Sequence, residues 1–327
     1  MAQNVIEELG KIGIVPVIKI DDAQKAVPLA KALSEGGIPC AEITFRTAAG
    51  EEAIRKISAS CPQVIVGAGT VLTTAQVDAA ISAGAKFVVS PGLNPKIVAY
   101  CISKNIPIIP GCTNPSDIEA ALEAGLNTVK FFPAEQAGGL EYIKAISAPY
   151  SNVKFMPTGG INAANIAKYI AFDKIVACGG SWMVGADLLD AGNFSGITEL
   201  CKEAVRTMLG FSVAHIGINA KNAEEASSGA KMFASLFGLS IKDGNTSIFA
   251  SDGIEIMKAQ GRGTNGHIAI ATNSVFRAIE FFRRQNIAGQ NIAIIEDSIK
   301  RDAKNNITLA YLKDEILGFA VHLVQKK

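Results

Sequence analysis

The chain has 327 residues, of which 49% are hydrophobic and 19% are charged, and its formal net charge is +1. This balance indicates a folded globular protein, long enough for two domains, and excludes a disordered or fibrous chain. A near-neutral charge, without basic runs among aromatic residues, predicts no nucleic-acid partner.

The N-terminal segment, residues 1–9, mixes acids into a helical pattern and has no basic start or apolar core of a signal peptide. No apolar stretch is long enough to span a membrane, so we expect no membrane partner. The six cysteines form no Cys-x-x-Cys pair, which favours reduced thiols over disulfides or a zinc–thiolate site. We therefore expect a cytoplasmic protein.

From residue 13 onward, short β-branched runs alternate with longer alanine-rich helical patterns, which is typical of β/α units around a parallel sheet. Several of the helical patterns end near a glycine, as at Gly36, Gly84 and Gly125. The predicted strands are residues 14–20, 41–45, 65–69, 87–90, 106–110, 128–132, 154–157 and 174–178. Eight such units in about 200 residues predict an α/β fold, a (β/α)8 TIM barrel, over residues 1–210.

The pattern changes after residue 210, and all three histidines of the chain follow this point. Two short modules are predicted, each with a strand, a helix and further strands. Their predicted strands are residues 215–218, 247–249 and 254–257 in the first, and 267–270, 292–295, 307–309 and 319–322 in the second. This internal duplication predicts a smaller α+β domain of two βαβββ modules over residues 211–327.

Lys130 lies inside the apolar run of residues 128–133. Lysine is rarely buried without a partner, and a desolvated ammonium loses part of its preference for the charged form. A buried lysine is therefore more readily the free amine that attacks a carbonyl to form a Schiff base. The alternative is a lysine that points outward or a paired core cation. Lys86 and Lys154 begin their predicted strands, at the opposite end of the barrel, and are poorer candidates.

In a TIM barrel the reacting groups gather at the carboxyl ends of the strands. The polar or wall-forming residues that end the second, third, fourth and sixth predicted strands are Glu42, Arg46, Thr70, Pro91, Lys130 and Phe132. The seventh and eighth strands end in Thr158-Gly159-Gly160 and Gly179-Gly180-Ser181, where barrel proteins hold phosphates on backbone N–H groups. We therefore expect a phosphorylated or otherwise anionic substrate, and Lys19, ending the first strand, is a further candidate contact.

No histidine precedes His215, so the barrel contains neither a Ser-His-Asp nucleophile nor a histidine-ligated zinc that polarises a carbonyl. A lysine Schiff base needs neither. The protonated imine accepts the electrons of a breaking carbon–carbon bond, while a nearby carboxylate shuttles the proton. Glu42 is the one acid among these strand ends and is the candidate general acid/base.

Six segments carry a resemblance to a known family: residues 42–47, 66–72, 90–92, 109–111, 130–135 and 157–161. They resemble the 2-keto-3-deoxy-6-phosphogluconate (KDPG) aldolase family, which also handles 4-hydroxy-2-oxoglutarate (KHG). The resemblance spans residues 1 to 209. It implies a class I aldolase, usually a homotrimer, that needs no cofactor and releases pyruvate together with glyceraldehyde 3-phosphate or glyoxylate.

The resemblance also implies roles for the candidate residues. Lys130 would form the Schiff base with pyruvate, and Glu42 would be the general acid/base. Arg46 and Thr70 would hold the pyruvyl carboxylate. Pro91 and Phe132 would form walls of the site. The phosphate or distal polar end of the substrate would be held by Thr158, Gly159, Gly160, Gly179, Gly180 and Ser181.

Two alternatives stay open from the residues alone. One is a phosphate-binding isomerase or epimerase, in which Lys130 acts electrostatically and no covalent adduct forms. The other is a non-catalytic sensor, in which the barrel binds a keto acid and the C-terminal modules signal. The sequence also leaves open whether the substrate is of the phosphogluconate or the hydroxyoxoglutarate type, because one anionic site accepts a phosphate or a carboxylate.

The duplicated modules resemble the vicinal oxygen chelate group, which includes glyoxalases. That resemblance places metal ligands on the first and last strands of each module, and His215, Glu255 and His267 match three such positions. Where the second module would offer its acid, this chain has Ala320, with His322 two residues on. Three ligands with open positions suit zinc, manganese or iron(II), but structural histidines are the alternative, and we assign no metal from the sequence. We expect a binding, regulatory or oligomerising role.

Overall fold

The computed structural model describes residues 2–284, 286–287 and 290–326. The chain divides into two compact units, Met1–Met208 and Leu209–Lys327. Among the described residues, no helix combines the length and the hydropathy that a membrane span requires.

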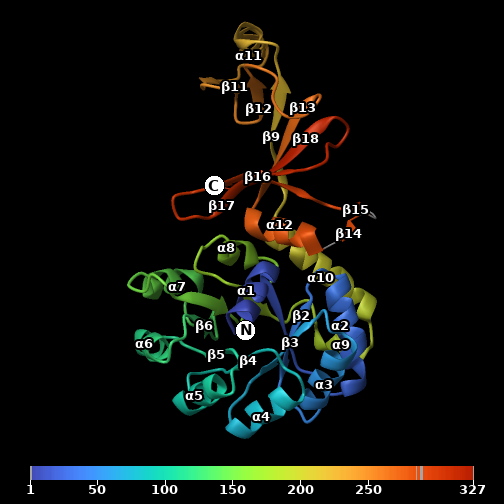
Figure 1. Cartoon of the computed structure of the whole chain (residues 1–327), viewed down its shortest axis with the longest axis vertical. Helices are drawn as coiled ribbons and strands as arrows, with labels where there is room; N and C mark the ends of the chain where they lie inside the picture. The colour runs from blue at the N-terminus through green and yellow to red at the C-terminus, as the bar shows by residue number, and fades with distance from the viewer. Residues whose placement is uncertain (1, 285, 288–289, 327) are drawn as a thin grey trace. The chain divides into compact units, whose positions relative to one another are not determined.

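In the first unit, short parallel strands alternate with helices (Figure 1). The strands are β1 Ile14–Ile18, β2 Cys40–Thr44, β3 Ile65–Gly69, β4 Val88–Val89, β5 Ile108–Ile109, β6 Thr128–Phe131, β7 Lys154–Pro157 and β8 Cys178–Gly180. The helices are α1 Ala2–Ile12, α2 Ala26–Glu35, α3 Gly50–Ser60, α4 Thr74–Ser82, α5 Pro95–Ser103, α6 Pro115–Glu123, α7 Gly139–Ser147, α8 Ile166–Ile170, α9 Ala186–Asp190 and α10 Phe194–Leu209, with a 3-10 turn at Ala23–Lys25.

The helix starts follow local sequence chemistry. Thr73 caps α4 and forms a reciprocal capping box with Gln76. Asn94 and Asn114 cap α5 and α6, and each is followed at once by a proline. These side chains accept the backbone N–H groups that a helix leaves unpaired at its first turn, and proline has no N–H to lose there. Each helix therefore begins shortly after a strand end, which keeps the connections short.

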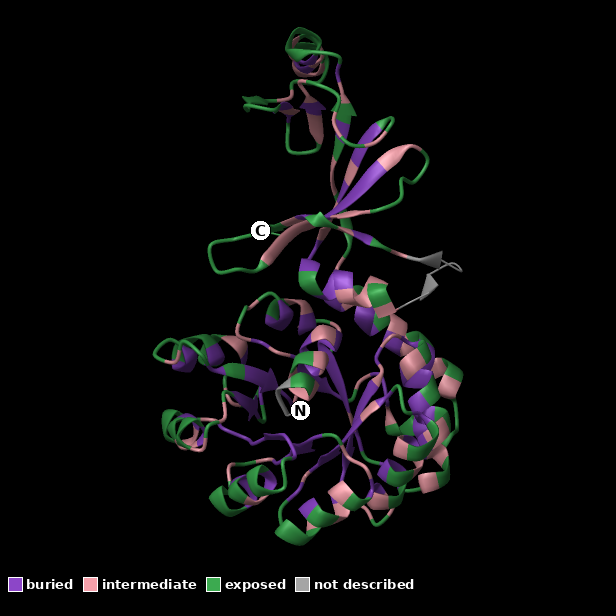
Figure 2. Cartoon of the chain, viewed as in Figure 1, coloured by how far each residue is buried: buried purple, intermediate pink, exposed green. Residues whose placement is uncertain are grey.

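The strands of the first unit form a curled parallel sheet in the order β5-β4-β3-β2-β1-β8, and β6 and β7 form a separate parallel pair. Single parallel bridges link these two sets, from Gly111 to Lys130 on one side and from Thr158 to Gly179 on the other. The strands of the first unit are largely buried (Figure 2), and the largest buried side chains of the unit include Phe87, Phe131 and Phe155.

Some strand bounds differ from the predicted ones. The predicted strand at residues 174–178 is instead β8 at Cys178–Gly180, and Ile175 makes only a single bridge to Phe155. Glycine is a poor strand former, so the sequence does not indicate a strand there. Residues 179 and 180 are extended because they pair with Val15 and Pro16 of β1. Tertiary pairing therefore outweighs local propensity at this position.

The second unit is built on one eight-stranded sheet in the order β10-β11-β12-β9-β13-β18-β17-β16. Its strands are β9 Ser212–Asn219, β10 Ile241–Asp243, β11 Ser247–Ala250, β12 Ile254–Met257, β13 Gly266–Thr272, β16 Ile294–Arg301, β17 Ile307–Leu312 and β18 Phe319–Gln325, and a small hairpin joins β14 Asn286–Ile287 to β15 Gln290–Asn291. Its helices after α10 are α11 Ala223–Phe237 and α12 Val275–Arg284.

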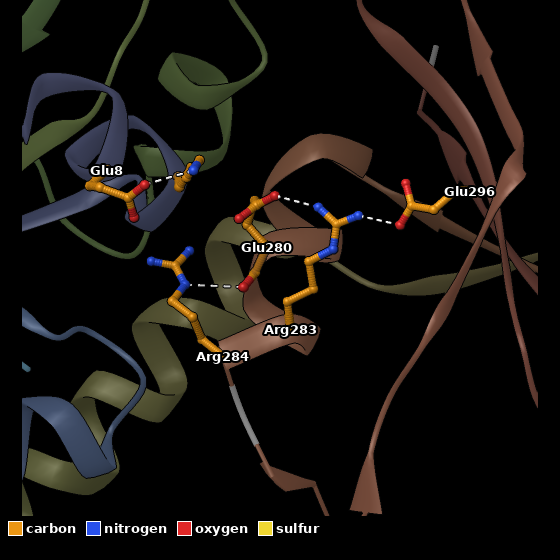
Figure 3. A network of polar contacts seen from close by, with 6 residues as sticks. Glu8, Glu280, Arg283, Arg284 and Glu296 are labelled. Carbon is orange, nitrogen blue, oxygen red and sulfur yellow. Dashed lines mark hydrogen bonds and ion pairs between the residues drawn. The ribbon is translucent and has the colours of Figure 1, made fainter. Parts of the chain in front are cut away.

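The element order in this unit repeats. A first strand, β9 or β13, is followed by a helix and then by three strands of the sheet, and the first and last strands of each set are parallel neighbours. The two sets join through the antiparallel pair β9 and β13. On α12, Arg283 forms ion pairs with Glu280 of the same helix and Glu296 of β16 (Figure 3). This pair of contacts links the helix to the sheet edge.

Candidate functional site

The centre of the first unit holds a buried ion pair. Strand β6 presents Lys130, which is 6% exposed, and strand β2 presents Glu42, which is 0% exposed. The Lys130 Nζ lies 3.2 Å from Glu42 Oε1, although the two residues are 88 positions apart in the chain. Glu42 Oε2 is buried and has no hydrogen-bond partner among the described residues. Removing two charges from water costs free energy, so a buried pair of this kind among the parallel strands is a candidate functional site.

The lysine is further shaped by its neighbours. Its Nζ lies 5.4 Å from the ring centroid of Phe132, whose side chain is 37% exposed at the end of β6. The backbone of Lys130 is fixed by the parallel bridge to Gly111. Lys130 N donates to Pro110 O at 2.8 Å, and Cys112 N donates to Lys130 O at 2.8 Å. The main chain that carries the amine is therefore fixed.

Glycine at position 69 makes room for the carboxylate. A Cβ atom at Gly69 would lie 2.4 Å from Glu42 Oε1, far inside van der Waals contact. Strands β2 and β3 pair in register, with Thr44 opposite Gly69. The Glu42 side chain therefore lies across the inner face of β3 at a point where only a hydrogen fits.

Two polar residues follow the neighbouring strands. Arg46 is exposed, and its Nε donates to Thr44 Oγ1 at 3.3 Å, while Thr44 Oγ1 donates to Ile18 O at 2.9 Å. Thr70, directly after β3, has a φ of 57°, in the left-handed region. A β-branched residue there costs about 1–3 kcal/mol, and such strain collects at ligand sites. Both residues stand at the carboxyl ends of strands that carry Glu42 or pair with its strand.

The turn after β7 adjoins strand β8. Gly159 and Gly160 have φ values of 100° and 78°, which glycine adopts at little cost. Thr158 is buried and bridges to Gly179, where a Cβ atom would lie 2.3 Å from Thr158 Oγ1. A glycine-rich turn, the glycine pair of β8 and a threonine hydroxyl are thus brought together from segments about 20 residues apart, although the sequence predicted the second glycine pair to lie in a turn. Of the predicted wall and turn residues, Pro91 is half-buried and Ser181 is exposed.

The sequence reasoning gave no role to two residues beside these turns. Tyr169 of α8 donates a hydrogen bond to Glu135 Oε1, and Glu135 N donates to Gly159 O at 3.1 Å. Burial, followed by this contact with Glu135, raises the pKa of Tyr169. Glu135 lies in the segment of residues 130–135 that carries the family resemblance, whereas nothing in the local sequence singles out Tyr169. Tyr169 therefore holds Glu135, and Glu135 in turn holds the backbone of Gly159 in the turn after β7.

A second polar cluster lies in the sheet of the second unit. His215 on β9, Glu255 on β12 and His267 on β13 meet there, with one ligand-type atom of each residue within 4.8 Å of the others. The Glu255 Oε2 lies 3.1 Å from His215 Nε2 and 3.0 Å from His267 Nε2. Two histidines and a carboxylate that converge in this way form a donor set for a divalent metal ion.

The carboxylate of this cluster is held in its charged form. Burial by itself raises the pKa of Glu255, but hydrogen bonds with His215, then His267, then Ser247 outweigh it and bring the pKa well below its usual range. Ser247 Oγ donates to Glu255 Oε1 at 2.6 Å. Ser247 was not singled out from the sequence, although it lies in a predicted strand whose alternate residues share a face with Glu255. A charged carboxylate is the form that ligates a cation.

The strand register corrects the expectation for the second module. Glu255 is opposite Gly217, which is two residues after His215. The equivalent position in the second module is opposite Ala269, two residues after His267, and it is occupied by His322. Ala320, the residue predicted to replace the acid, lies opposite His267 itself. That prediction was wrong because a two-residue shift keeps the same face of a strand, so alternation alone does not determine register.

His322 is surrounded by aromatic rings. Its ring centroid lies 5.1 Å from that of His267, 5.5 Å from that of His215 and 4.7 Å from that of Tyr311. The side chain is buried, and its Nδ1 has no hydrogen-bond partner among the described residues. Burial, then the neighbouring His267 and His215, lowers the pKa of His322 to about 3. The imidazole is therefore neutral near pH 7, with a lone pair on one nitrogen.

A buried lysine paired with a carboxylate among parallel strands is the arrangement that Schiff-base carbon–carbon lyases use. Comparison with known proteins agrees with this class. The family model described as KDPG and KHG aldolase matches residues 5–200, and the chain belongs to that family. The match ends before the second unit begins.

Curated relatives share this first part of the chain. The 2-dehydro-3-deoxy-phosphogluconate aldolase of Haemophilus influenzae is 51% identical over 203 residues, which are 62% of this chain and 96% of the relative. The enzyme of the same name from Treponema pallidum is 48% identical over 203 residues, 62% of this chain and 97% of the relative. The KHG/KDPG aldolase of Escherichia coli K12 is 45% identical over 192 residues, 59% of this chain and 90% of the relative.

Solved structures give the same result. The KDPG aldolase of Legionella pneumophila, with pyruvate captured as a covalent carbinolamine intermediate, is 38% identical with a TM-score of 0.59 and covers 61% of this chain and 97% of its own. The KDPG aldolase of Zymomonas mobilis ZM4 with 3-phosphoglycerate is 39% identical with a TM-score of 0.58 and covers 61% of this chain and 94% of its own. The first unit is thus an aldolase of the lyase class.

Proposed function

We propose that the first unit is a class I aldolase that cleaves KDPG to pyruvate and glyceraldehyde 3-phosphate, KHG to pyruvate and glyoxylate, or both. The observation that carries this proposal is the 3.2 Å contact between Lys130 Nζ and Glu42 Oε1 in the buried interior. A nucleophilic amine and a proton carrier within hydrogen-bond reach are the two groups that Schiff-base chemistry requires. The named substrates of the relatives supply the choice of keto acid.

In the first half of the reaction, Lys130 passes the extra proton of its ammonium group to Glu42. The free amine then attacks C2 of the keto acid, and a proton moves from the nitrogen to the former carbonyl oxygen to give a carbinolamine. Glu42, as the acid, protonates the carbinolamine hydroxyl, which leaves as water while the nitrogen lone pair forms the C=N bond. The product is a protonated imine that carries a positive charge beside the carbon–carbon bond to be broken. Glu42 is left as the carboxylate.

In the second half, the Glu42 carboxylate removes the proton of the C4 hydroxyl. The C3–C4 bond breaks, its electron pair moves to form the C2=C3 bond of an enamine, and the aldehyde leaves. Glu42 then returns its proton to C3. Water adds to the resulting imine, and pyruvate and the free amine of Lys130 are released. In this scheme Glu42 carries out every proton transfer to and from the substrate. Its Oε1 contacts Lys130 Nζ, and its buried Oε2 has no hydrogen-bond partner among the described residues, so Oε2 is available to the substrate.

The residues that flank Lys130 and Glu42 bind the two ends of the substrate. In this proposal Arg46 and Thr70 hold the pyruvyl carboxylate, and Pro91 and Phe132 form the walls. The phosphate or distal carboxylate is held by Thr158, Gly159 and Gly160 after β7 and by Gly179, Gly180 and Ser181 at the end of β8. The adjacency of the two segments through the Thr158 and Gly179 bridge supports one shared anion site.

Three features of the whole molecule belong to the same proposal. We propose that the eight strands of the first unit close into a (β/α)8 barrel, with the bridges at Lys130 and Thr158 as support. We propose a homotrimer, which sedimentation of the intact chain tests. All six cysteines lie in the described part of the chain, and no disulfide joins any of them, which supports a reducing, cytoplasmic setting.

The test is borohydride reduction of the full chain in the presence of pyruvate, followed by peptide mass mapping. A pyruvyl mass on Lys130 is expected. Lys130→Met should give no adduct and no turnover, whereas Lys154→Met, which removes an exposed lysine at the start of β7, should behave as the wild type. A folded, pyruvate-saturated protein without an adduct would favour the isomerase or the sensor instead. Turnover of KDPG and KHG then ranks the two substrates.

We also propose that the second unit is a glyoxalase-like domain in which His215, Glu255 and His267 bind one divalent cation. The mutual distances of their ligand atoms and the charged state of Glu255 support this. When bound, a cation of this kind supplies a Lewis acid and a crosslink between strands. Metal analysis of the full chain after dialysis against a zinc buffer tests it, and His215→Ala should lose the ion.

A further inference from the structure

The chain just after β6 holds the backbone of the turn after β7. Ala134 N donates to Thr158 O at 2.8 Å, and Glu135 N donates to Gly159 O at 3.1 Å. Two successive carbonyl groups of the turn therefore point toward this segment. In a trans peptide the C=O and the N–H of the next residue point in opposite directions. The N–H groups of Gly159 and Gly160 therefore point away from the segment after β6.

The direction of these two N–H groups suits an anion. Strand β7 has β6 on one side, and on the other side Thr158 bridges to Gly179 of β8. N–H groups that turn away from the chain after β6 therefore point to the side of β8. Successive N–H groups on one side of a turn form a concave anion-binding site. The Gly160 N–H has no hydrogen-bond partner among the described residues, so it is available to a phosphate or carboxylate oxygen.

The side chain of Glu135 is anchored outside this turn. A Cβ atom at Gly160 would lie 2.6 Å from Glu135 Cγ, so the stem of the side chain packs directly on that glycine. Glu135 Oε1 accepts a hydrogen bond from the hydroxyl of Tyr169, a residue that is 2% exposed. A Cβ atom at Gly139 would lie 3.2 Å from both of these oxygens. Gly139 is the first residue of α7, and the N-terminus of a helix favours a negative charge.

We propose that Glu135, anchored by Tyr169, is a positioning residue for the distal anion of the substrate. This inference rests on the aldolase proposed above. Glu135 acts through its backbone N–H, which orients the peptide between Gly159 and Gly160 so that the next N–H meets the anion. The hydroxyl of Tyr169 keeps the negative charge of Glu135 at the start of α7 and away from the phosphate. The pair therefore controls affinity for the distal end of the substrate and leaves carbon–carbon cleavage to Lys130 and Glu42.

The test compares two aldehydes that differ only in the phosphate. The full chain condenses pyruvate with D-glyceraldehyde 3-phosphate or with D-glyceraldehyde, and kcat and KM are measured for each. Tyr169→Phe should raise KM for the phosphorylated aldehyde about tenfold, because it misaligns a hydrogen bond to a charged group. Its kcat, and both constants for D-glyceraldehyde, should stay within about threefold of the wild type. Inhibition by inorganic phosphate should weaken by a similar factor of about ten.

Three further variants separate positioning from general damage. Glu135→Ala removes the anchored side chain and should raise the same KM about tenfold. Glu135→Gln keeps an acceptor for the Tyr169 hydroxyl, so it should restore this KM to within about threefold of the wild type. Tyr150→Phe is the matched control, because it removes a similar hydrogen bond, from Tyr150 to Glu119 Oε1 at 3.0 Å, at the exposed surface. It should change neither KM.

Deuterium exchange at the methyl group of pyruvate distinguishes this inference from the proposal beneath it. That exchange requires Lys130 and Glu42 but no distal anion, so Tyr169→Phe and Glu135→Ala should keep the wild-type rate. If the wild type neither exchanges nor condenses, both proposals fall.

Two other results overturn the positioning role alone. One is an equal loss for both aldehydes together with slower exchange, which shows a general structural defect. The other is a KM for the phosphorylated aldehyde that stays within threefold in both variants. Should Tyr169→Phe not fold, Glu135→Ala decides the question, because the Glu135 side chain is exposed and its removal leaves no buried cavity.

Discussion

Adding one methyl group at position 69 should slow catalysis strongly while leaving Lys130 in place. Gly69 has a φ outside the left-handed region, so alanine is compatible with the backbone there. A Cβ atom at this place would lie 2.4 Å from Glu42 Oε1, 2.6 Å from its Cγ and 2.9 Å from its Cδ. Because all three atoms are too close, rotating the carboxylate does not relieve the overlap. The whole Glu42 side chain must shift.

The size of that shift follows from the contact distances. Real Cβ contacts essentially never fall under 3.0 Å, so the 2.4 Å distance requires Glu42 Oε1 to retreat by at least 0.6 Å. Catalytic groups must be held within about 0.5 Å of their productive geometry, and a misplacement of about 1 Å can cost 10²-fold in rate. We therefore expect Gly69→Ala to lower kcat by about 100-fold. Lys130 keeps its place on β6, so borohydride with pyruvate should still label it.

Steady-state cleavage of KDPG, coupled to pyruvate reduction, measures kcat and KM. Gly67→Ala is the matched control on the same strand, because the atoms nearest to its methyl group would be those of the Phe87 ring, at 2.5 Å. The control should lower stability by about 1–3 kcal/mol through overpacking, with kcat largely kept at a temperature where it stays folded. If Gly69→Ala keeps kcat within threefold of the wild type, Glu42 is not the proton carrier or its position is not critical.

Three further predictions concern the rest of the chain. Gly179→Ala, whose Cβ would lie 2.3 Å from Thr158 Oγ1, should raise KM for the phosphorylated substrate about tenfold by displacing that hydroxyl, whereas Gly92→Ala, with nothing within 4 Å, should not. Burial raises the pKa of Cys101 to about 12, so this thiol favours its neutral form in the fold. Its contribution to stability is complete below the unfolded value of 9.0 and declines as the pH rises from 9 toward 12, and alkylation at pH 8 should be slow until the protein unfolds. A chain ending at Leu209 should remain an active aldolase, since relatives of that length are complete enzymes, and inactivity of a folded truncation would show that the units are coupled.

Much of the first unit follows from local sequence. Apolar runs of four to seven residues alternate with helical patterns that end near glycines, and this alternation indicates parallel β/α units. The spacing of the apolar residues in each segment determines which of its faces is buried. Lys130 is conspicuous because a charge interrupts such a run. The sequence pattern around Lys130 does not identify its partner. Glu42 is 88 positions away, and only the curling of the sheet brings its carboxylate within 3.2 Å of the amine.

The second unit shows more clearly what local sequence patterns do not determine. The sequence by itself determined that two modules repeat and that histidines open both, because spacing and alternation are local properties. It placed Ala320 at the fourth ligand position. Only the tertiary structure decided that β13 and β18 pair with Ala269 opposite His322, since residues 320 and 322 share a face and hydrogen bonds between distant strands select one register. The same holds for Thr70, whose left-handed backbone is imposed by the surrounding tertiary structure and is disfavoured by its own side chain.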